Sequence, residues 1–234
     1  MTAVDETKRD KARARMLAEI EREALDTKSW TGRPVYSPRG MEAVRKVPRH
    51  AFVPESDAAY AYVNRPRSIG HGQTISQPYI VALMSELLDL KPGDRVLEIG
   101  TGCGYQAAVL AELAGEVLSV ETVAALAESA AERLRRLGYR NVEVRHGDGF
   151  KGWPEKAPFD AAIVTAAPER IPDALTQQLK PGGRLVIPVG KPHDTQMLYR
   201  CVKGEDDTLV CEKMLPVAFV PMVARPDDER KWLV

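Results

Sequence analysis

The chain has 234 residues, with 33 basic and 33 acidic side chains and therefore a formal net charge of zero at pH 7. A chain of this length can bury the core of one domain with an appendage, and its balanced charge excludes a global field that recruits nucleic acid or an anionic membrane. No apolar run is long enough for a membrane-spanning helix, and residues 1–25 are too charged for a signal peptide. We therefore expect a cytoplasmic protein without nucleic-acid or membrane partners.

The N-terminal residues 1–30 read as a charged extension. Residues 5–25 are rich in Lys, Arg, Glu and Ala and carry a narrow apolar stripe that includes Met16 and Ile20, which predicts a peripheral, partly frayed helix. Acidic residues interrupt the basic ones, which argues against a basic arm that binds RNA. From residue 31 to 67, recurring prolines and scattered aromatics predict an irregular cap over a site.

The segment 68–78 reads Ser-Ile-Gly-His-Gly-Gln-Thr-Ile-Ser-Gln-Pro and precedes apolar residues at helical spacing that end near residue 91. Ser76 and Pro78 are therefore expected to open an amphipathic helix. In one interpretation the Ser76 hydroxyl only caps that helix. In the other it contacts a ligand, because the free amides at a helix start favour an anion.

From residue 96 onward, strands and helices are expected to alternate. After the strand that ends at Ile99 we expect helices near 106–113, 123–137 and 172–179, strands at 117–120, 142–144, 161–164 and 184–188, and further strand-like runs at 197–202 and 213–220. This order predicts an α/β fold with a doubly wound, mainly parallel, Rossmann-like sheet. Within a domain of residues 31–234, we expect a cap and acceptor segment (31–92), a cofactor-binding core (93–190), and C-terminal strands with a tail (191–234).

The strand end is followed by Gly-Thr-Gly-Cys-Gly at 100–104, and Glu121 lies 21 residues after Gly100. Such glycines let the backbone turn tightly and approach a ligand, and an acid at that distance can accept hydrogen bonds from ribose hydroxyls. The spacing differs from the dinucleotide pattern G-x-G-x-x-G, and no Gly-Lys-Ser or Gly-Lys-Thr follows to grip a terminal phosphate. With Glu98 at the strand end, the pattern favours S-adenosylmethionine over a dinucleotide or a purely structural turn.

The three cysteines are Cys103, Cys201 and Cys211, an odd number without C-x-x-C spacing. This pattern argues against a zinc site and against a disulfide framework. It favours a reducing compartment, in agreement with the expected cytoplasmic location.

Several segments together resemble the protein-L-isoaspartate O-methyltransferase family, namely residues 68–78, 100–105, 147–149 and 179–190. The most specific of them is Thr74–Pro78, and Val-Pro-Arg-His-Ala-Phe-Val-Pro at 47–54 is also similar to bacterial members. The resemblance spans roughly residues 45–223. The N-terminal extension lies outside it, and Cys103 stands where a serine is frequent.

The resemblance implies methyl transfer from S-adenosyl-L-methionine to the free α-carboxylate of L-isoaspartyl residues in age-damaged proteins and peptides. The resulting ester recloses to a succinimide, which is a repair reaction. The resemblance also implies a monomer without a metal, Ser76 as the catalytic residue, and substrate contacts from Thr74, Ile75, Ser76 and Gln77. Cofactor contacts are expected from Gln73, Thr74, Glu98, Gly100, Thr101, Gly102, Gly104, Glu121, Asp148 and Gly149.

The chemistry of a carboxylate acceptor suits these residues. A carboxyl group with a pKa of about 3.5 to 4 is already ionised at pH 7, so methylation needs no general base. It needs an in-line approach to the methyl group, which makes proximity, alignment and removal of water the main contributions to catalysis.

Some alternatives remain open at the level of sequence. One is an S-adenosylmethionine-dependent methyltransferase that acts on a small molecule or RNA. Another is a nicotinamide dehydrogenase, which the glycine spacing disfavours. At the residue level, Glu121 can be a solvated acid and Asp148 can stabilise a turn through its own backbone.

Overall fold

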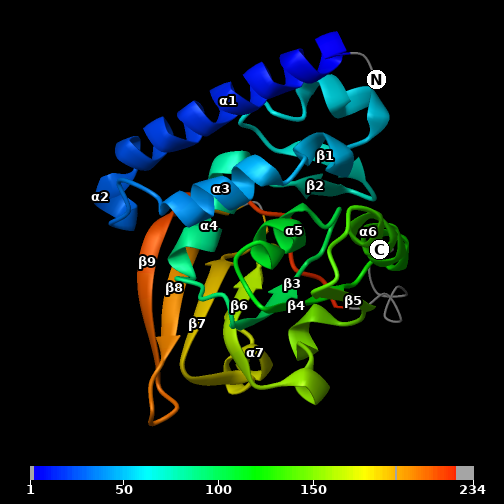
Figure 1. Cartoon of the computed structure of the whole chain (residues 1–234). Coiled ribbons are helices and arrows are strands. Elements are labelled where there is room, and N and C mark those ends of the chain that lie inside the picture. Colours follow the sequence, from blue (N-terminus) through cyan, green and yellow to red (C-terminus); the bar gives the residue numbers. More distant parts are fainter. Residues whose placement is uncertain (1–2, 193, 225–234) are drawn as a thin grey trace.

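The computed structural model describes residues 3–192 and 194–224. The helices are α1 (Ala3–Asp26), α2 (Lys28–Thr31), α3 (Pro38–Lys46), α4 (Pro78–Leu87), α5 (Tyr105–Ala111), α6 (Ala124–Arg136) and α7 (Asp173–Gln177), and the 3-10 turns are η1 (Arg49–Phe52), η2 (Glu55–Tyr60), η3 (Gly149–Lys151) and η4 (Pro154–Lys156). The strands are β1 (Arg67–Gly70), β2 (Gln73–Ile75), β3 (Arg95–Ile99), β4 (Glu116–Glu121), β5 (Val142–His146), β6 (Phe159–Val164), β7 (Leu179–Val189), β8 (Gln196–Lys203) and β9 (Leu209–Val217). Figure 1 shows α1 lying across one end of the molecule, above the sheet.

A seven-stranded sheet has the order β5-β4-β3-β6-β7-β8-β9. Strands β5 to β7 pair in parallel, and β8 and β9 add antiparallel at one edge. This architecture confirms the predicted doubly wound, mainly parallel sheet. The chain order reverses between β3 and β6, and ligands of open α/β sheets bind beyond the carboxyl ends of the strands at such a point.

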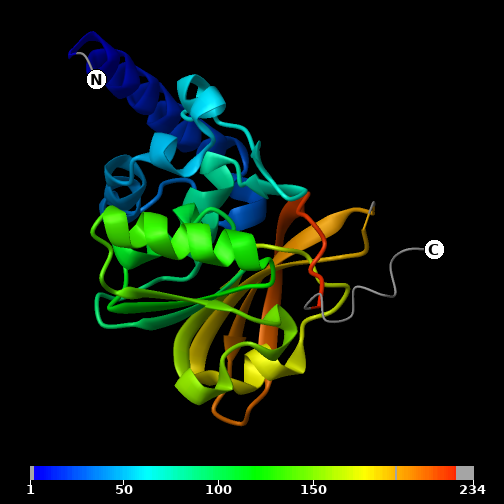
Figure 2. The same cartoon turned by 90° about the vertical axis from the view of Figure 1, so that its right-hand side faces the viewer.

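The two faces of the sheet bury different sets of side chains. Along β3, Val96 packs into a core shared with α1, α3, α4 and α5, whereas Leu97 packs into a core shared with α7. Successive side chains of a strand point to opposite faces, so burial on both faces explains why Val96 and Leu97 of β3 are both apolar. In Figure 2, α7 and its neighbouring turns lie on the side of the sheet away from α1.

The N-terminal helix is more firmly packed than the peripheral, frayed helix that we expected. Met16 and Ile20 are 0% exposed and Ala24 is 1% exposed, and α1 packs against α4. The expectation was wrong because three apolar side chains at a spacing of four residues are enough to bury one face of a helix.

The region between α1 and α4 is also more regular than the predicted irregular cap. Ser37 caps α3, with its hydroxyl accepting a hydrogen bond from the amide of Gly40 at 3.1 Å. Residues 67–75 form an antiparallel hairpin of β1 and β2 that leads directly to Ser76 and the start of α4.

The cysteine pattern requires a correction. Cys201 of β8 lies opposite Cys211 of β9, and the two form a disulfide, while Cys103 is free and buried. Their separation of 10 residues gives no sign of this pairing in the sequence, because the antiparallel register alone brings them together. Among the described residues, no helix is long and apolar enough to cross a membrane, and no cluster of His, Cys, Asp and Glu could hold a metal ion.

Candidate active site at the carboxyl ends of β3, β4 and β6

The glycine turn after β3 depends on backbone that other residues rarely adopt. Gly100, Gly102 and Gly104 have φ angles of +95°, +54° and +88°. A Cβ at Gly100 would collide with the side-chain oxygen of Thr165, and a Cβ at Gly104 would lie 3.1 Å from Leu134 Cδ1 of α6. The turn therefore needs glycine both for its conformation and for its close contacts with β6 and α6.

Glu121 ends β4 and is fixed against this turn. Its Oε2 accepts a hydrogen bond from the amide of Gly102 at 2.8 Å, its Oε1 accepts one from the amide of Val123 at 2.9 Å, and the residue is only 5% exposed. The interpretation as a solvated acid is therefore wrong. A carboxylate can accept about four hydrogen bonds, so both oxygens retain capacity for ribose hydroxyls.

Glu98 supports the turn from behind. It is 0% exposed, and burial raises the pKa of its carboxyl group to about 8. The Ser119 hydroxyl donates to Glu98 Oε2 and lies 2.5 Å from the hydroxyl of Thr101 in the turn. The contact of Glu98 with the cofactor stays a prediction. In this geometry, the hydroxyl groups of Ser119 and Thr101 link Glu98 to the turn.

Asp148 and Gly149 have different surroundings. Asp148 Oδ1 accepts a hydrogen bond from the amide of Phe150 at 2.9 Å, which is the turn-stabilising role that we had considered. Gly149 lines a pocket beside the glycine turn, and a Cβ at Gly149 would lie 2.6 Å from Ile99 Cγ2. Asp148 is not among the pocket-lining residues, so its contact with the cofactor remains a prediction.

Six of the predicted cofactor residues line one pocket, namely Gln73, Thr74, Gly100, Gly102, Glu121 and Gly149. Thr101 lines a small adjoining cavity, Gly104 ends the turn at the N-cap of α5, and Glu98 lies behind the turn. The described residues of this pocket include no Lys or Arg that could pair with a phosphate. A glycine cradle with a ribose acceptor fits S-adenosylmethionine, and its G-x-G-x-G spacing differs from the dinucleotide pattern.

Ser76 does not cap α4. The capping position belongs to Gln77, whose side chain makes no capping hydrogen bond. The Ser76 hydroxyl has no hydrogen-bond partner among the described residues and lines a large cavity as well as the small one beside the turn. The capping interpretation is therefore wrong, and the hydroxyl is free to bind a ligand.

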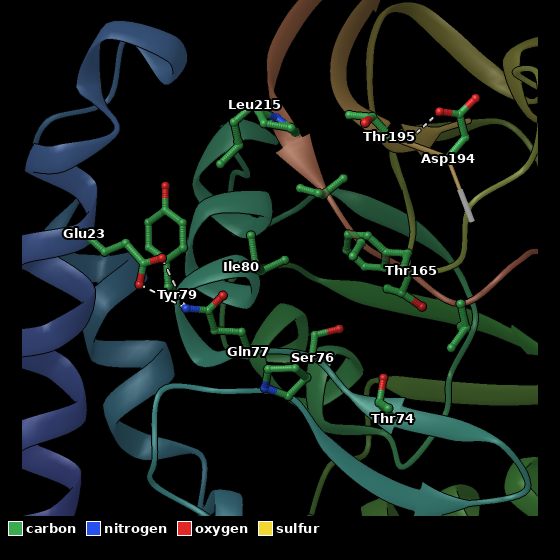
Figure 3. A pocket seen from close by; sticks show the side chains of 16 residues that line it. Glu23, Thr74, Ser76, Gln77, Tyr79, Ile80, Thr165, Asp194, Thr195 and Leu215 are labelled. Atoms are coloured by element: carbon green, nitrogen blue, oxygen red, sulfur yellow. Dashed lines mark hydrogen bonds between the residues drawn. The ribbon is translucent and has the colours of Figure 1, made fainter. Parts of the chain in front are cut away.

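The large cavity has a volume of about 710 Å³ and lies between α1, α4, the end of β9 and the end of β6. Figure 3 shows Ser76 and Thr74 along one side of it, with Thr165 facing them. The Thr165 hydroxyl donates to the backbone oxygens of Ile99 at 3.1 Å and Gly100 at 2.6 Å, which joins the cavity wall to the glycine turn. Ile75 is almost fully buried, so its side chain supports the segment rather than facing the cavity.

One functional candidate that the sequence did not reveal is Glu23 of α1. Its carboxylate accepts hydrogen bonds from Gln77 Nε2 at 3.0 and 3.2 Å (Figure 3) and from Asn64 Nδ2 at 2.8 Å. Burial raises the pKa of Glu23, although these amide donors act in the opposite direction. Because the Gln77 amide nitrogen is held by Glu23, its oxygen is available to the cavity.

A scan against family models matches residues 19–227 to protein-L-isoaspartate(D-aspartate) O-methyltransferase. Protein-L-isoaspartate O-methyltransferase 2 of Syntrophobacter fumaroxidans is 56% identical over 211 residues, which cover 90% of this chain and 85% of that protein. A solved protein-L-isoaspartate O-methyltransferase is 30% identical with a TM-score of 0.77, and the match covers 93% of this chain and 68% of the solved chain. A putative enzyme of this kind from Plasmodium falciparum, solved with S-adenosyl-L-homocysteine, has the same fold, with a TM-score of 0.73 at 24% identity, and the match covers 89% of this chain and 96% of its own. The chain therefore belongs to the protein-L-isoaspartate O-methyltransferase family.

Proposed function

We propose that this protein transfers the methyl group of S-adenosyl-L-methionine to the free α-carboxylate of L-isoaspartyl residues in damaged proteins. The observation that carries the proposal is the position of Ser76 in the segment Thr74–Pro78, where its hydroxyl, without a partner among the described residues, faces a cavity that adjoins the glycine turn. Membership of the family does not favour the alternative of a small-molecule or RNA methyltransferase. The ester product recloses to a succinimide without further catalysis.

The residues of the site bind two molecules, which are the cofactor and the substrate. Glu121 and the backbone of the glycine turn hold the adenosine end of the cofactor, which supplies a methyl group on a cationic sulfur. The hydroxyl groups of Ser76 and Thr74 orient the substrate carboxylate, and the Gln77 oxygen accepts a hydrogen bond from the substrate backbone. No group has to remove a proton, so alignment and exclusion of water supply the catalytic effect.

The N-terminal helix belongs to this site. We divided the chain at residue 30, but Glu23 lines the substrate cavity, and we therefore group α1 with the cap of residues 31–92. The divisions at residues 93 and 191 are kept, because the core between them contains the glycine turn and Glu121.

We also propose a cytoplasmic monomer whose partners are damaged proteins and peptides. The Cys201–Cys211 disulfide of the structure argues against this location, because thiols are kept reduced in most cytoplasms. Titration of free thiols in protein isolated under acid quenching tests the location. A cytoplasmic protein yields Cys201 and Cys211 as free thiols.

A labelling experiment tests the proposed reaction. Two peptides that differ only in an aspartyl or isoaspartyl linkage are incubated with the protein and methyl-labelled cofactor, with RNA present in a parallel sample. Base-labile label is expected on the isoaspartyl peptide and scarcely on its twin. Label on RNA alone, or equal label on both peptides, contradicts the proposal.

A further inference from the structure

Arg49 is a wholly buried cation beside the acceptor segment. It lies in η1 within the stretch Val-Pro-Arg-His-Ala-Phe-Val-Pro and is 0% exposed. Its Nη2 donates to the backbone oxygen of Ser76 at 2.7 Å, and its Nε donates to that of Ala61 at 2.8 Å. Its Nη1 is buried without a partner, and no carboxylate forms an ion pair with Arg49 in the described part of the chain.

A buried charge without a counter-ion is expensive. The desolvation of a guanidinium costs several kcal/mol, and two carbonyl oxygens with one aromatic face recover only part of it. That face belongs to Tyr105, whose ring centre lies 4.7 Å from Arg49 Cζ and which begins α5 directly after the glycine turn. Burial lowers the pKa of Arg49, but a guanidinium is not deprotonated in proteins and stays charged at neutral pH.

The large cavity, which is the proposed substrate site, has an excess of acidic side chains. The acidic side chains of its described lining are those of Glu23 and Asp194, and the lining has no Lys or Arg, although its proposed ligand is an anion. A carboxylate that enters this cavity leaves water and approaches two acids, so it needs a positive charge from outside the lining. Arg49 is held against the backbone of Ser76, whose side chain lines the cavity.

We propose, on the basis of the proposed function, that Arg49 is a positioning residue and the charge partner of the bound isoaspartyl carboxylate. Its hydrogen bond to the Ser76 carbonyl fixes the turn that presents the Ser76 hydroxyl. Its charge, screened little by the buried surroundings, favours a carboxylate over a neutral group of the same shape at that hydroxyl.

Two substitutions separate the charge from the hydrogen bond. Arg49→Gln keeps a donor for a backbone oxygen but removes the charge, and Arg49→Lys keeps the charge but loses the forked geometry. Arg184→Met is a control away from the cavity: Arg184 also donates to a backbone oxygen, that of Leu88 at 2.9 Å, but it forms an ion pair with Asp94 and does not line the cavity.

The readout is the dissociation constant of two peptides, measured by calorimetry with S-adenosylhomocysteine bound. One is the isoaspartyl peptide and the other is its α-carboxamide twin, which is neutral and of the same shape. In Arg49→Gln, the preference for carboxylate over carboxamide is expected to fall at least ~10-fold, which corresponds to about 1.4 kcal/mol. The carboxamide affinity should stay within about 2-fold of the unsubstituted protein, and Arg184→Met should keep the full preference.

Arg49→Lys is expected to keep most of the preference while its kcat falls, and it decides the question if urea unfolding shows that Arg49→Gln does not fold. Equal weakening of both peptides in a folded Arg49→Gln protein overturns the inference and leaves a purely structural role. Loss of the preference in a folded Arg49→Lys protein also overturns it. Failure of the unsubstituted protein to methylate the isoaspartyl peptide would instead reject the proposed function itself.

Discussion

Replacing Ser76 by alanine tests its assignment without disturbing the fold. The Ser76 hydroxyl makes no hydrogen bond to a described residue, and Gln77 holds the capping position of α4. The free energy of unfolding should therefore change by less than about 0.5 kcal/mol, as for a substitution that removes no packed group. A hydrogen bond to a charged group contributes ~1.5 to 3 kcal/mol, so its loss should reduce turnover of the isoaspartyl peptide by ~10- to 100-fold.

Three measurements on Ser76→Ala complete this test. They are kcat with the isoaspartyl peptide, the dissociation constant of S-adenosylmethionine and the midpoint of urea unfolding, each compared with Ser129→Ala. Ser129 lies in α6 and donates only to the backbone oxygen of Leu126, at 3.2 Å. Normal turnover in a stable Ser76→Ala protein would refute the substrate contact. A loss of turnover that follows a loss of stability would refute the reasoning about capping.

Four further outcomes follow from the structure. Glu121→Ala removes the proposed ribose acceptor and two backbone contacts of the turn, so calorimetry should show a cofactor dissociation constant raised tens-fold or more, for ~2 to 4 kcal/mol of lost hydrogen bonding. Unchanged affinity in a folded variant would exclude this role. Glu23→Ala releases the Gln77 amide and should raise KM for the peptide about 5-fold with cofactor affinity unchanged, so an equal change in both constants would argue against it. Glu98 has a folded pKa raised to about 8, so the cost of ionising it is absent below its ordinary pKa of 4.5 and complete above about pH 8. Urea unfolding should therefore show the parent losing stability relative to Glu98→Gln between those two pH values, and a constant difference would contradict the assignment. Reducing the Cys201–Cys211 disulfide, which closes a loop of 10 residues, should cost about 2 to 3 kcal/mol of stability. The kcat should stay unchanged because neither cysteine lines the cavity. A large loss of kcat in folded, reduced protein would show coupling to the site.

The parts of the fold that the sequence predicted are those dictated by local chemistry. The turn at Gly100 to Gly104 was recognisable because its positive φ angles require glycine at fixed positions. The parallel sheet was recognisable because strands and helices alternate along the chain from β3 to β7.

The missed features depend on contacts between distant segments. Glu23 is one of several acids in α1, and nothing in the sequence distinguishes it from Glu19 or Glu21 until α1 is placed on α4. Arg49 lay within a segment that we noted, but its burial against Ser76 is a tertiary contact. The Cys201–Cys211 pair was missed for a similar reason, since the register of β8 and β9 decides which residues are opposite.

The central claim is that methylation by this protein starts the repair of isoaspartyl linkages, and conversion of a defined peptide tests it most directly. An isoaspartyl peptide is incubated with the protein and S-adenosylmethionine, and the aspartyl, isoaspartyl, succinimide and methyl-ester forms are separated by chromatography over time. The account predicts a transient methyl ester on the isoaspartyl form, then succinimide, and a growing fraction of aspartyl peptide that requires the cofactor. Persistence of the isoaspartyl peptide, or esterification of the aspartyl form at the same rate, would contradict it.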